Sequence, residues 1–96
     1  MGETFEIFKT MVASTAHIEE QDLEALRVFS DFFIVQEDDY GSAILISDED
    51  SLKHISQLRV SEGLKLLVLF AASNGCRWLR LDADGPLYDN FPVYDW

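Results

Sequence analysis

Residues 61–86 read SEGLKLLVLFAASNGCRWLRLDADGP, and the order of the fold can be worked out from this stretch. The run 63–72 is apolar almost all round a helix, which predicts a helix that is central to the protein. Ser61, with an acidic residue directly behind it, is typical of a helix start. Asn74 and Gly75 together are typical of a helix stop, so the helix is expected to end there.

The apolar residues that follow this helix predict a last strand over 76–81. We expect Cys76 and Trp78 to point inward, together with Leu79 or Leu81. The residues after this strand contain two prolines and several aromatic side chains. They predict an irregular but ordered segment that wraps around the domain.

Toward the N-terminus, the spacing of apolar residues predicts five further elements. They are a strand over 5–12, a helix over 19–29, strands over 32–36 and 44–46, and a short helix with Leu52, Ile55 and Leu58 on one face. Gly41 lies in the acidic turn 37–42 between the two short strands, which predicts a hairpin. The order β-α-β-β-α-α-β predicts an α+β fold, a small, mainly antiparallel sheet with helices packed on one face. Residues 1–96 are expected to form a single compact acidic domain.

Charge is the most pronounced feature of the composition. Eighteen acidic residues against seven basic ones give a formal net charge of −11. Such a field repels nucleic acid and anionic membranes and attracts basic protein surfaces, so we expect a basic protein partner and neither nucleic-acid nor membrane binding. Solubility alone is the alternative explanation. A single cysteine, the absence of a signal peptide and the shortness of every apolar run predict a cytoplasmic protein, which we expect to be a monomer.

The DADG sequence at 82–85 resembles the D-x-D-G motif of the haloacid dehalogenase phosphatases. In that family the first Asp attacks phosphorus, the second acts as acid and base, and magnesium lies between them. Here Pro86 stands where the family has Thr, and no lysine follows Lys65 to complete such a site. A small metal-dependent phosphohydrolase using Asp82 and Asp84 is therefore kept only as an alternative. We expect no enzymatic activity and interpret the motif as a turn whose Asp side chain bonds nearby backbone amides.

No other pattern predicts a metal or cofactor site. A calcium-binding EF-hand loop would need a third Asp before the Gly and a Glu at its end, and both are missing. His17, His54 and Cys76 lie far apart and lack the spacing of a zinc site. We interpret His17 as a loop or capping residue and Cys76 as a core residue. No cofactor is therefore expected.

The acids are concentrated in parts of the chain that have few bases. The helix start at 19–24 and the residues from 82 onward are acidic, and a third group lies between residues 31 and 50, where no base occurs. The residues of this third group are those we expect to bind a partner: Asp31, Glu37, Asp38, Asp39, Asp48, Glu49 and Asp50. Helix starts favour acids, which accounts for Asp48 and Glu49 but not for three consecutive acids at 37–39.

Both ends of the chain resemble a small bacterial family without an assigned function. The resemblance is carried by VASTAHI at 12–18, by GCRWLRLDADGP at 75–86 and by FPVYDW at 91–96. Members of that family lie on plasmids and prophages, often beside antirestriction genes. In size, charge and compactness the chain is also similar to anti-CRISPR proteins, several of which act as acidic decoys for DNA.

These resemblances imply an inhibitor of a bacterial defence system, carried by a phage or another mobile element. The leading hypothesis is an anti-CRISPR protein that blocks the DNA-binding surface of a type I surveillance complex, by mimicry of DNA or by steric exclusion. Carboxylates can replace phosphates as partners of Arg and Lys because both offer paired acceptor oxygens. The main alternative is an immunity protein or antitoxin that neutralises a basic nuclease in the same way.

Overall fold

The computed structural model describes residues 7–28, 35–46, 53 and 55–95 of the chain. Its helices and strands are β1 (Lys9–Ser14), the 3-10 helix η1 (Thr15–His17), α1 (Glu20–Val28), β2 (Val35–Glu37), β3 (Gly41–Leu45), α3 (Glu62–Ser73) and β4 (Cys76–Asp82). A further helical turn includes Lys53 and residues 55–57. The predicted order of elements is confirmed.

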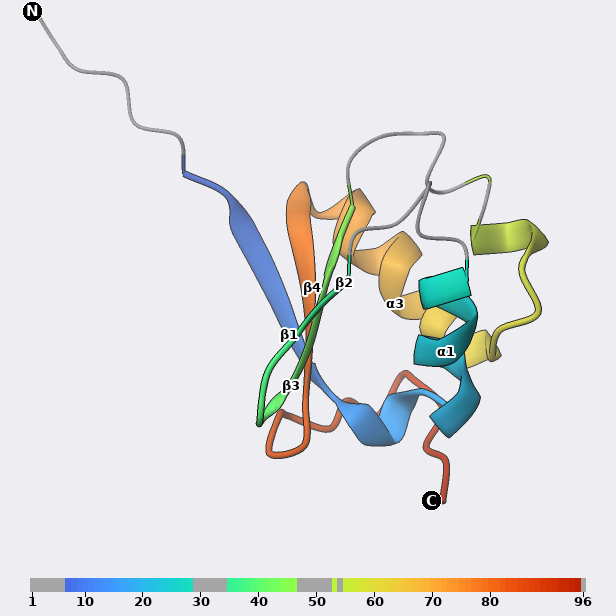
Figure 1. Ribbon diagram of the computed structural model, residues 1–96. Helices are drawn as coiled ribbons and strands as arrows, with labels where there is room; N and C mark the ends of the chain where they lie inside the picture. Colours follow the sequence, from blue (N-terminus) through green and yellow to red (C-terminus); the bar gives the residue numbers. More distant parts are fainter. Residues whose placement is uncertain (1–6, 29–34, 47–52, 54, 96) are drawn as a thin grey trace, which may run out of the picture.

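The four strands form one sheet in the order β1-β4-β3-β2. β4 runs parallel to β1 and antiparallel to β3, and β2 pairs antiparallel with β3. The helices lie on one side of this sheet (Figure 1). The α+β fold with a mainly antiparallel sheet is therefore confirmed, and the β1–β4 pair is its parallel part. No helix in the described ranges is long and apolar enough to cross a membrane.

The strands begin and end a few residues from their predicted limits. β1 continues to Ser14, beyond the predicted end, while the predicted start of this strand at 5–6 lies outside the described residues, as does 32–34 of the second strand. β3 begins earlier than predicted because the hairpin turn is tight. The backbone N–H of Asp38 donates to the carbonyl oxygen of Gly41 at 3.0 Å, so only two residues form the loop.

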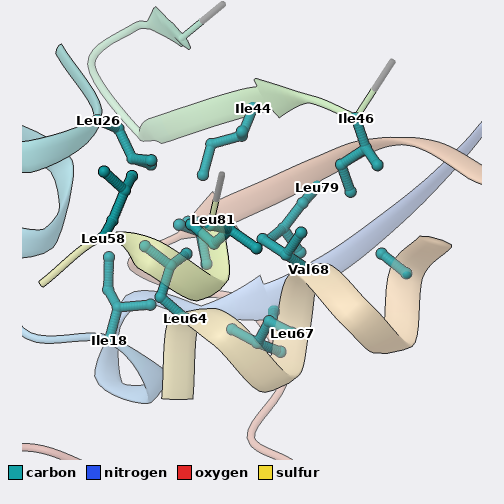
Figure 2. Packing of buried hydrophobic residues seen from close by; sticks show 13 residues of the cluster. Ile18, Leu26, Ile44, Ile46, Leu58, Leu64, Leu67, Val68, Leu79 and Leu81 are labelled. Carbon is teal, nitrogen blue, oxygen red and sulfur yellow. The ribbon is translucent and has the colours of Figure 1, made fainter. Parts of the chain in front are cut away.

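The core lies between the sheet and the helices (Figure 2). Its fully buried side chains come from both layers and include Ile18, Leu26, Ile44, Leu64, Leu67, Leu79 and Leu81. Leu26 lies on the apolar stripe that predicted α1, and Ile44 lies on a predicted strand. Burial of this cluster removes apolar surface from water and is the main stabilising contribution to the fold.

The inward side of β4 differs from the prediction. Leu79 and Leu81 are fully buried, and side chains alternate along a strand, so half-buried Trp78 points to the opposite face of the sheet. The expectation for Trp78 was wrong because each of the two alternating sets of this strand contains apolar side chains, and the pattern alone does not say which set meets the helices. Cys76 does pack against the core, because the register shifts between Cys76 and Trp78.

α3 begins and ends where the sequence predicted but is not buried on all sides. The Ser61 hydroxyl oxygen accepts the Leu64 N–H at 3.2 Å and caps the helix start. Gly75 ends the helix with a positive φ of 75°, which glycine adopts without strain. Leu69 and Phe70 are 45% and 51% exposed. A single helix layer leaves the outer side of α3 facing solvent, which the composition of the helix did not indicate.

The segment after β4 runs along the outer edge of β1, as the predicted wrap requires. The backbone N–H of Ser14 donates to the carbonyl oxygen of Pro86 at 2.9 Å. The hydroxyl of Tyr88 donates to the carbonyl oxygen of Val12 at 2.6 Å. These bonds satisfy backbone groups that an edge strand leaves unpaired.

Further along, the same segment reaches the start of α3. The N–H of Tyr94 donates to the carbonyl oxygen of Ala16 at 2.7 Å, and the Tyr94 hydroxyl oxygen accepts the N–H of Gly63 at 3.2 Å. A Cβ atom at Gly63 would lie 1.9 Å from the carbonyl oxygen of His17. Glycine is therefore required where the helix start, η1 and the C-terminal segment meet.

His17 holds the C-terminal segment through both of its ring nitrogens. The fully buried imidazole accepts the N–H of Tyr88 at Nε2 (2.8 Å), and its Nδ1 lies 2.7 Å from the carbonyl oxygen of Pro92. An N–H only donates and a carbonyl only accepts, so these contacts select the neutral tautomer with its proton on Nδ1. The ring of Phe91 packs edge-on at a centroid distance of 5.8 Å. His17 thus has no free nitrogen and serves to attach the segment.

Deletion of residues 91–96 is expected to lower the melting temperature by more than about 10 °C. The truncation removes the acceptor of the buried His17 Nδ1–H and both contacts of Tyr94, and an unsatisfied buried donor alone costs about 1–3 kcal/mol. Circular dichroism melting curves measure the change. Val93→Ala is the control, since this side chain is 64% exposed and should leave the melting temperature almost unchanged. A truncated protein that melts like the full chain would contradict the packing of the segment.

Candidate functional site

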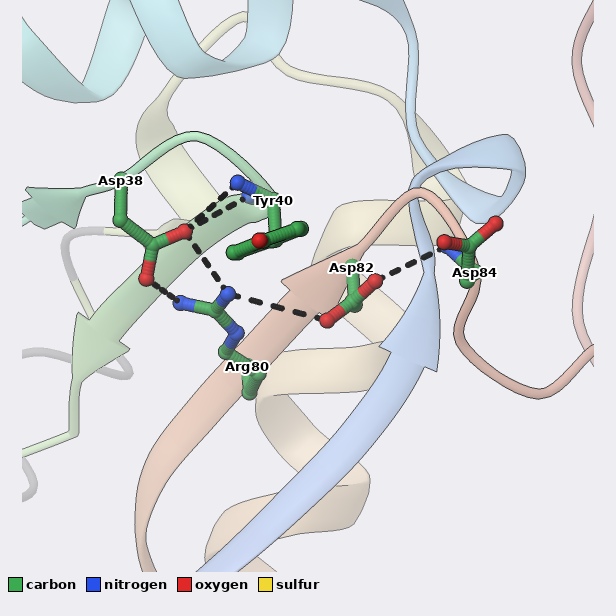
Figure 3. A network of polar contacts seen from close by, with 6 residues as sticks. Asp38, Tyr40, Arg80, Asp82 and Asp84 are labelled. Carbon is green, nitrogen blue, oxygen red and sulfur yellow. Dashed lines mark hydrogen bonds and ion pairs between the residues drawn. The ribbon is translucent and has the colours of Figure 1, made fainter.

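Asp38, at the end of the β2–β3 hairpin, is bound by the protein itself. Its carboxylate forms a two-pronged pair with Arg80, at 2.8 and 2.9 Å, and accepts the backbone N–H groups of Tyr40 and Gly41 at 2.8 and 3.0 Å (Figure 3). The hydrogen bonds from Arg80, followed by those from the backbone, hold the pKa of Asp38 well below its ordinary value. This predicted partner-binding residue therefore fixes the hairpin turn to β4.

Glu37 also has a basic partner within the protein, because its carboxylate forms an ion pair with Arg27 of α1. Arg27 contacts Glu24 as well, at 3.1 Å. Asp39 is exposed and forms no ion pair in the described part of the chain. The other predicted partner-binding residues, Asp31, Asp48, Glu49 and Asp50, lie outside the described residues. Of the three consecutive acids, only Asp39 is thus left without a basic partner.

The D-x-D-G sequence forms a turn at the end of β4. Oδ1 of Asp82 accepts the backbone N–H of Asp84 at 2.9 Å, and the N–H of Gly85 donates to the carbonyl oxygen of Asp82 at 2.9 Å. Oδ2 of Asp82 lies 3.7 Å from Arg80 (Figure 3). The bond from the Asp side chain to a nearby amide, which the turn interpretation predicted, is present. Among the described residues, no group of three His, Cys, Asp or Glu side chains could hold a metal ion.

Five of the described acids without a basic partner lie in segments that meet at one end of the molecule. Figure 1 shows the β2–β3 turn, η1, the start of α1, the turn after β4 and the last residues of the chain at this end. The N–H of Ala83 donates to the carbonyl oxygen of Tyr40 at 3.2 Å and joins two of these segments. We call this region the acidic end and define it by the carboxylates of Glu19, Glu20, Asp39, Asp84 and Asp95. No ion pair within the described ranges involves these five residues.

An open hollow lies within the acidic end. It has a volume of about 360 Å³ and is lined by Glu19, Glu20, Gln21, Tyr94 and Asp95. A hollow of this size and polarity can receive a guanidinium or ammonium group of a partner protein, which carboxylate oxygens bind by charge-assisted hydrogen bonds. Sequence reasoning missed this group because its two segments, 19–21 and 94–95, are more than seventy residues apart. The only signal was that each of the two segments is acidic.

Asp22 belongs to the acidic start of α1 but is fully buried. Its carboxylate accepts the N–H of Glu19 at 2.8 Å, the N–H of Ser61 at 2.9 Å and the hydroxyl of Ser61. Asp22 therefore completes the start of α1 and fixes it to the residue that caps α3. Asp22 lies three residues after Glu19, a spacing at which a side chain can accept the backbone N–H at the start of a helix. Nothing in the sequence indicated its contact with Ser61.

The substitution Asp22→Asn is expected to lower the free energy of unfolding by about 2–3 kcal/mol. An amide presents two donors and a single acceptor to a site that contains three donors, so at least one buried donor loses its partner. Urea unfolding curves measure the effect. Glu20→Gln makes the same change of charge on an exposed neighbour and should alter stability by no more than about 0.5 kcal/mol. Equal stabilities of the two variants would contradict the assigned role of Asp22.

The pair between Asp38 and Arg80 predicts a specific acid sensitivity. The pKa of Asp38 is lowered from an ordinary value of 3.8. The pair therefore stabilises the folded protein above this pH, and its contribution is lost as the pH falls through the lowered folded-state pKa. Asp38→Asn should be less stable than the wild type near neutral pH, and the difference should narrow toward about pH 2. Asp39→Asn, next to it and without a partner, should show no such narrowing in unfolding curves recorded across this range.

Comparison with protein families identifies the family of this chain. No curated protein and no solved structure matches the chain significantly. Residues 10–96 match the C-terminal domain of a family of unknown function, DUF5983. The match begins within β1 and includes the C-terminal segment and all five residues of the acidic end. The chain therefore belongs to the DUF5983 family.

Proposed function

We propose that this domain inhibits a bacterial defence system by binding a basic, nucleic-acid-handling protein surface through its acidic end. The target proposed first is the DNA-binding surface of a type I CRISPR surveillance complex. Binding there excludes DNA by charge and by bulk. No catalytic step, metal or cofactor is part of this proposal.

The observation that carries the proposal is the separation of the acids into two groups. Arg27 and Arg80 neutralise Glu37 and Asp38 within the fold. The five carboxylates of the acidic end have no such partner and come from four segments of the chain. Carboxylates at fixed positions on a folded scaffold offer Arg and Lys acceptor oxygens comparable to those of a row of phosphates.

The net charge supports fast association with a basic target. A charge of −11 on so small a protein steers a basic surface toward it over long range, and this attraction weakens with added salt. At physiological ionic strength, the dissolved ions screen this attraction beyond a distance of about 8 Å. Charge brings the partners together, and the hollow beside Tyr94 provides a place for a basic side chain at the contact.

The first experiment measures the plating of a phage on a strain whose active type I CRISPR system targets that phage. Expression of the protein should restore plating by orders of magnitude, because a blocked surveillance complex no longer binds the phage DNA. Unchanged plating, with the folded protein present in the cells, would overturn the CRISPR target. Rescue of cells from a basic nuclease without any effect on plating would instead favour the immunity-protein alternative.

The second experiment tests whether binding depends on where the negative charges lie or only on the net charge of the protein. Glu20→Gln combined with Asp95→Asn removes two negative charges from the acidic end. Gln57→Lys combined with Ser73→Lys raises the net charge by the same amount at exposed positions on the helices, away from the acidic end. The first pair should weaken binding at least tenfold, about 1.4 kcal/mol, and the second should have little effect. Equal losses in both pairs would mean that only the total charge matters.

A further inference from the structure

His17 is a buried ionisable side chain that joins two points of the C-terminal segment. Its Nε2 accepts the backbone N–H of Tyr88 at 2.8 Å, and its Nδ1 donates to the carbonyl oxygen of Pro92 at 2.7 Å. The residue has no exposed surface. A ring nitrogen accepts a hydrogen bond only while it keeps its lone pair, so both contacts exist together only in the neutral imidazole.

A second proton on the ring would turn the acceptor at Nε2 into a donor. Two N–H groups would then face each other across the 2.8 Å that separates Nε2 from the nitrogen of Tyr88, and the hydrogen bond would become a repulsive contact. The new positive charge would also be buried, which is costly unless a partner compensates it. The attached segment therefore excludes the charged ring, whereas a released histidine is free to bind the proton.

The side chains in contact with the ring cannot compensate a positive charge by ionising. The segment contributes the stacked ring of Tyr88, at a centroid distance of 6.0 Å, and the edge-on ring of Phe91, at 5.8 Å. Phenols ionise only in alkaline solution, so the first of these stays neutral in acid. From α3, the residue that meets the backbone of His17 is Gly63, which has no side chain.

The carboxylates of the neighbouring elements are directed elsewhere or exposed. Glu19, at the start of α1, accepts a hydrogen bond from Gln21. Glu62, beside the glycine of α3, and Asp89, in the segment, are both exposed. In the part of the chain that the structure describes, the two hydrogen bonds of the His17 ring go to backbone groups and not to a carboxylate.

We propose that protonation of His17 releases the C-terminal segment, from Tyr88 onward, so that acid detaches it from η1 and from the edge of β1. The released state binds a proton that the attached state excludes, so attachment is complete at neutral pH and weakens as the pH falls. Tyr94 and Asp95 lie on this segment and line the hollow of the acidic end, which release would take apart. The proposal does not depend on the proposed function.

Hydrogen exchange of single amides, recorded by NMR between pH 7 and pH 5, tests the proposal. The N–H of Tyr88 exchanges only when its bond to the ring opens, so its rate, corrected for the intrinsic effect of pH, measures the released population. A free histidine gains its proton near pH 6.5, and each unit below this value favours the released state about tenfold. The released population should therefore rise about 20-fold from pH 7 to pH 5.

The amide of Val68, inside α3, distinguishes release of the segment from unfolding of the whole protein. Release leaves α3 folded, so this amide should stay at least about ten times better protected than that of Tyr88 at every pH. Equal protection of the two amides would mean that the segment opens only when the protein unfolds. A released population that does not change between pH 7 and pH 5 would equally overturn the proposal.

The two histidines of the chain provide a matched pair of variants. Glutamine is neutral throughout this pH range, and its side-chain oxygen can accept the N–H of Tyr88, so His17→Gln should abolish the rise. His54→Gln makes the same change at a position outside the described residues and should keep the full rise. It also keeps the test decisive if His17→Gln does not fold. A rise that survives His17→Gln, or one that is lost in His54→Gln, would show that another group controls the segment.

Discussion

The pairing of β4 between β1 and β3 is the constraint on which the rest of the structure depends. β1 and β4 are the first and last described strands, so the sheet is complete only when distant parts of the chain meet. β4 supplies Leu79 and Leu81 to the core and Arg80 to the hairpin. The segment after it then returns along the edge of β1. Most of the stabilising contacts are consequently non-local, and such contacts must overcome a larger loss of chain entropy before they form.

The acids of this protein fall into two structural groups. Asp22 and Asp38 accept three or more hydrogen bonds each and connect elements of the fold: Asp22 joins α1 to α3, and Asp38 joins the hairpin to β4. The carboxylates of the acidic end form no ion pair within the described residues, and among them Glu19 accepts a hydrogen bond from Gln21. Glu19 and Glu20 suit the positive N-terminus of α1, and binding of a basic surface is the explanation we propose for the cluster as a whole.

Much of the fold could be predicted from local patterns. Ser61, the apolar run of α3 and Gly75 identified one helix with both of its ends, because capping and helix termination depend on neighbouring residues. The inward side of β4 could not be predicted, since Trp78 and Leu79 are both apolar and the helix layer selects between them. The parallel pairing of β1 with β4 is a tertiary choice that alternation does not encode.

The candidate site was predicted less well, for a related reason. The turn at 82–85 was interpreted correctly, whereas the basic partner expected from net charge stays a prediction. The pairing of Asp38 with Arg80 spans 42 residues, and the hollow between Glu20 and Asp95 spans still more, so spacing in the sequence carries no trace of either. Composition states how many carboxylates there are, whereas only the fold decides which of them remain available to a partner.

The central claim is that the acidic end occupies a surface on which the target binds DNA. The most direct measurement is the association of the protein with a purified type I surveillance complex, with and without saturating target DNA, over a series of salt concentrations. The account predicts an association rate that falls steeply with salt and binding that is abolished by bound DNA. Binding that is insensitive to salt and unaffected by DNA would contradict it.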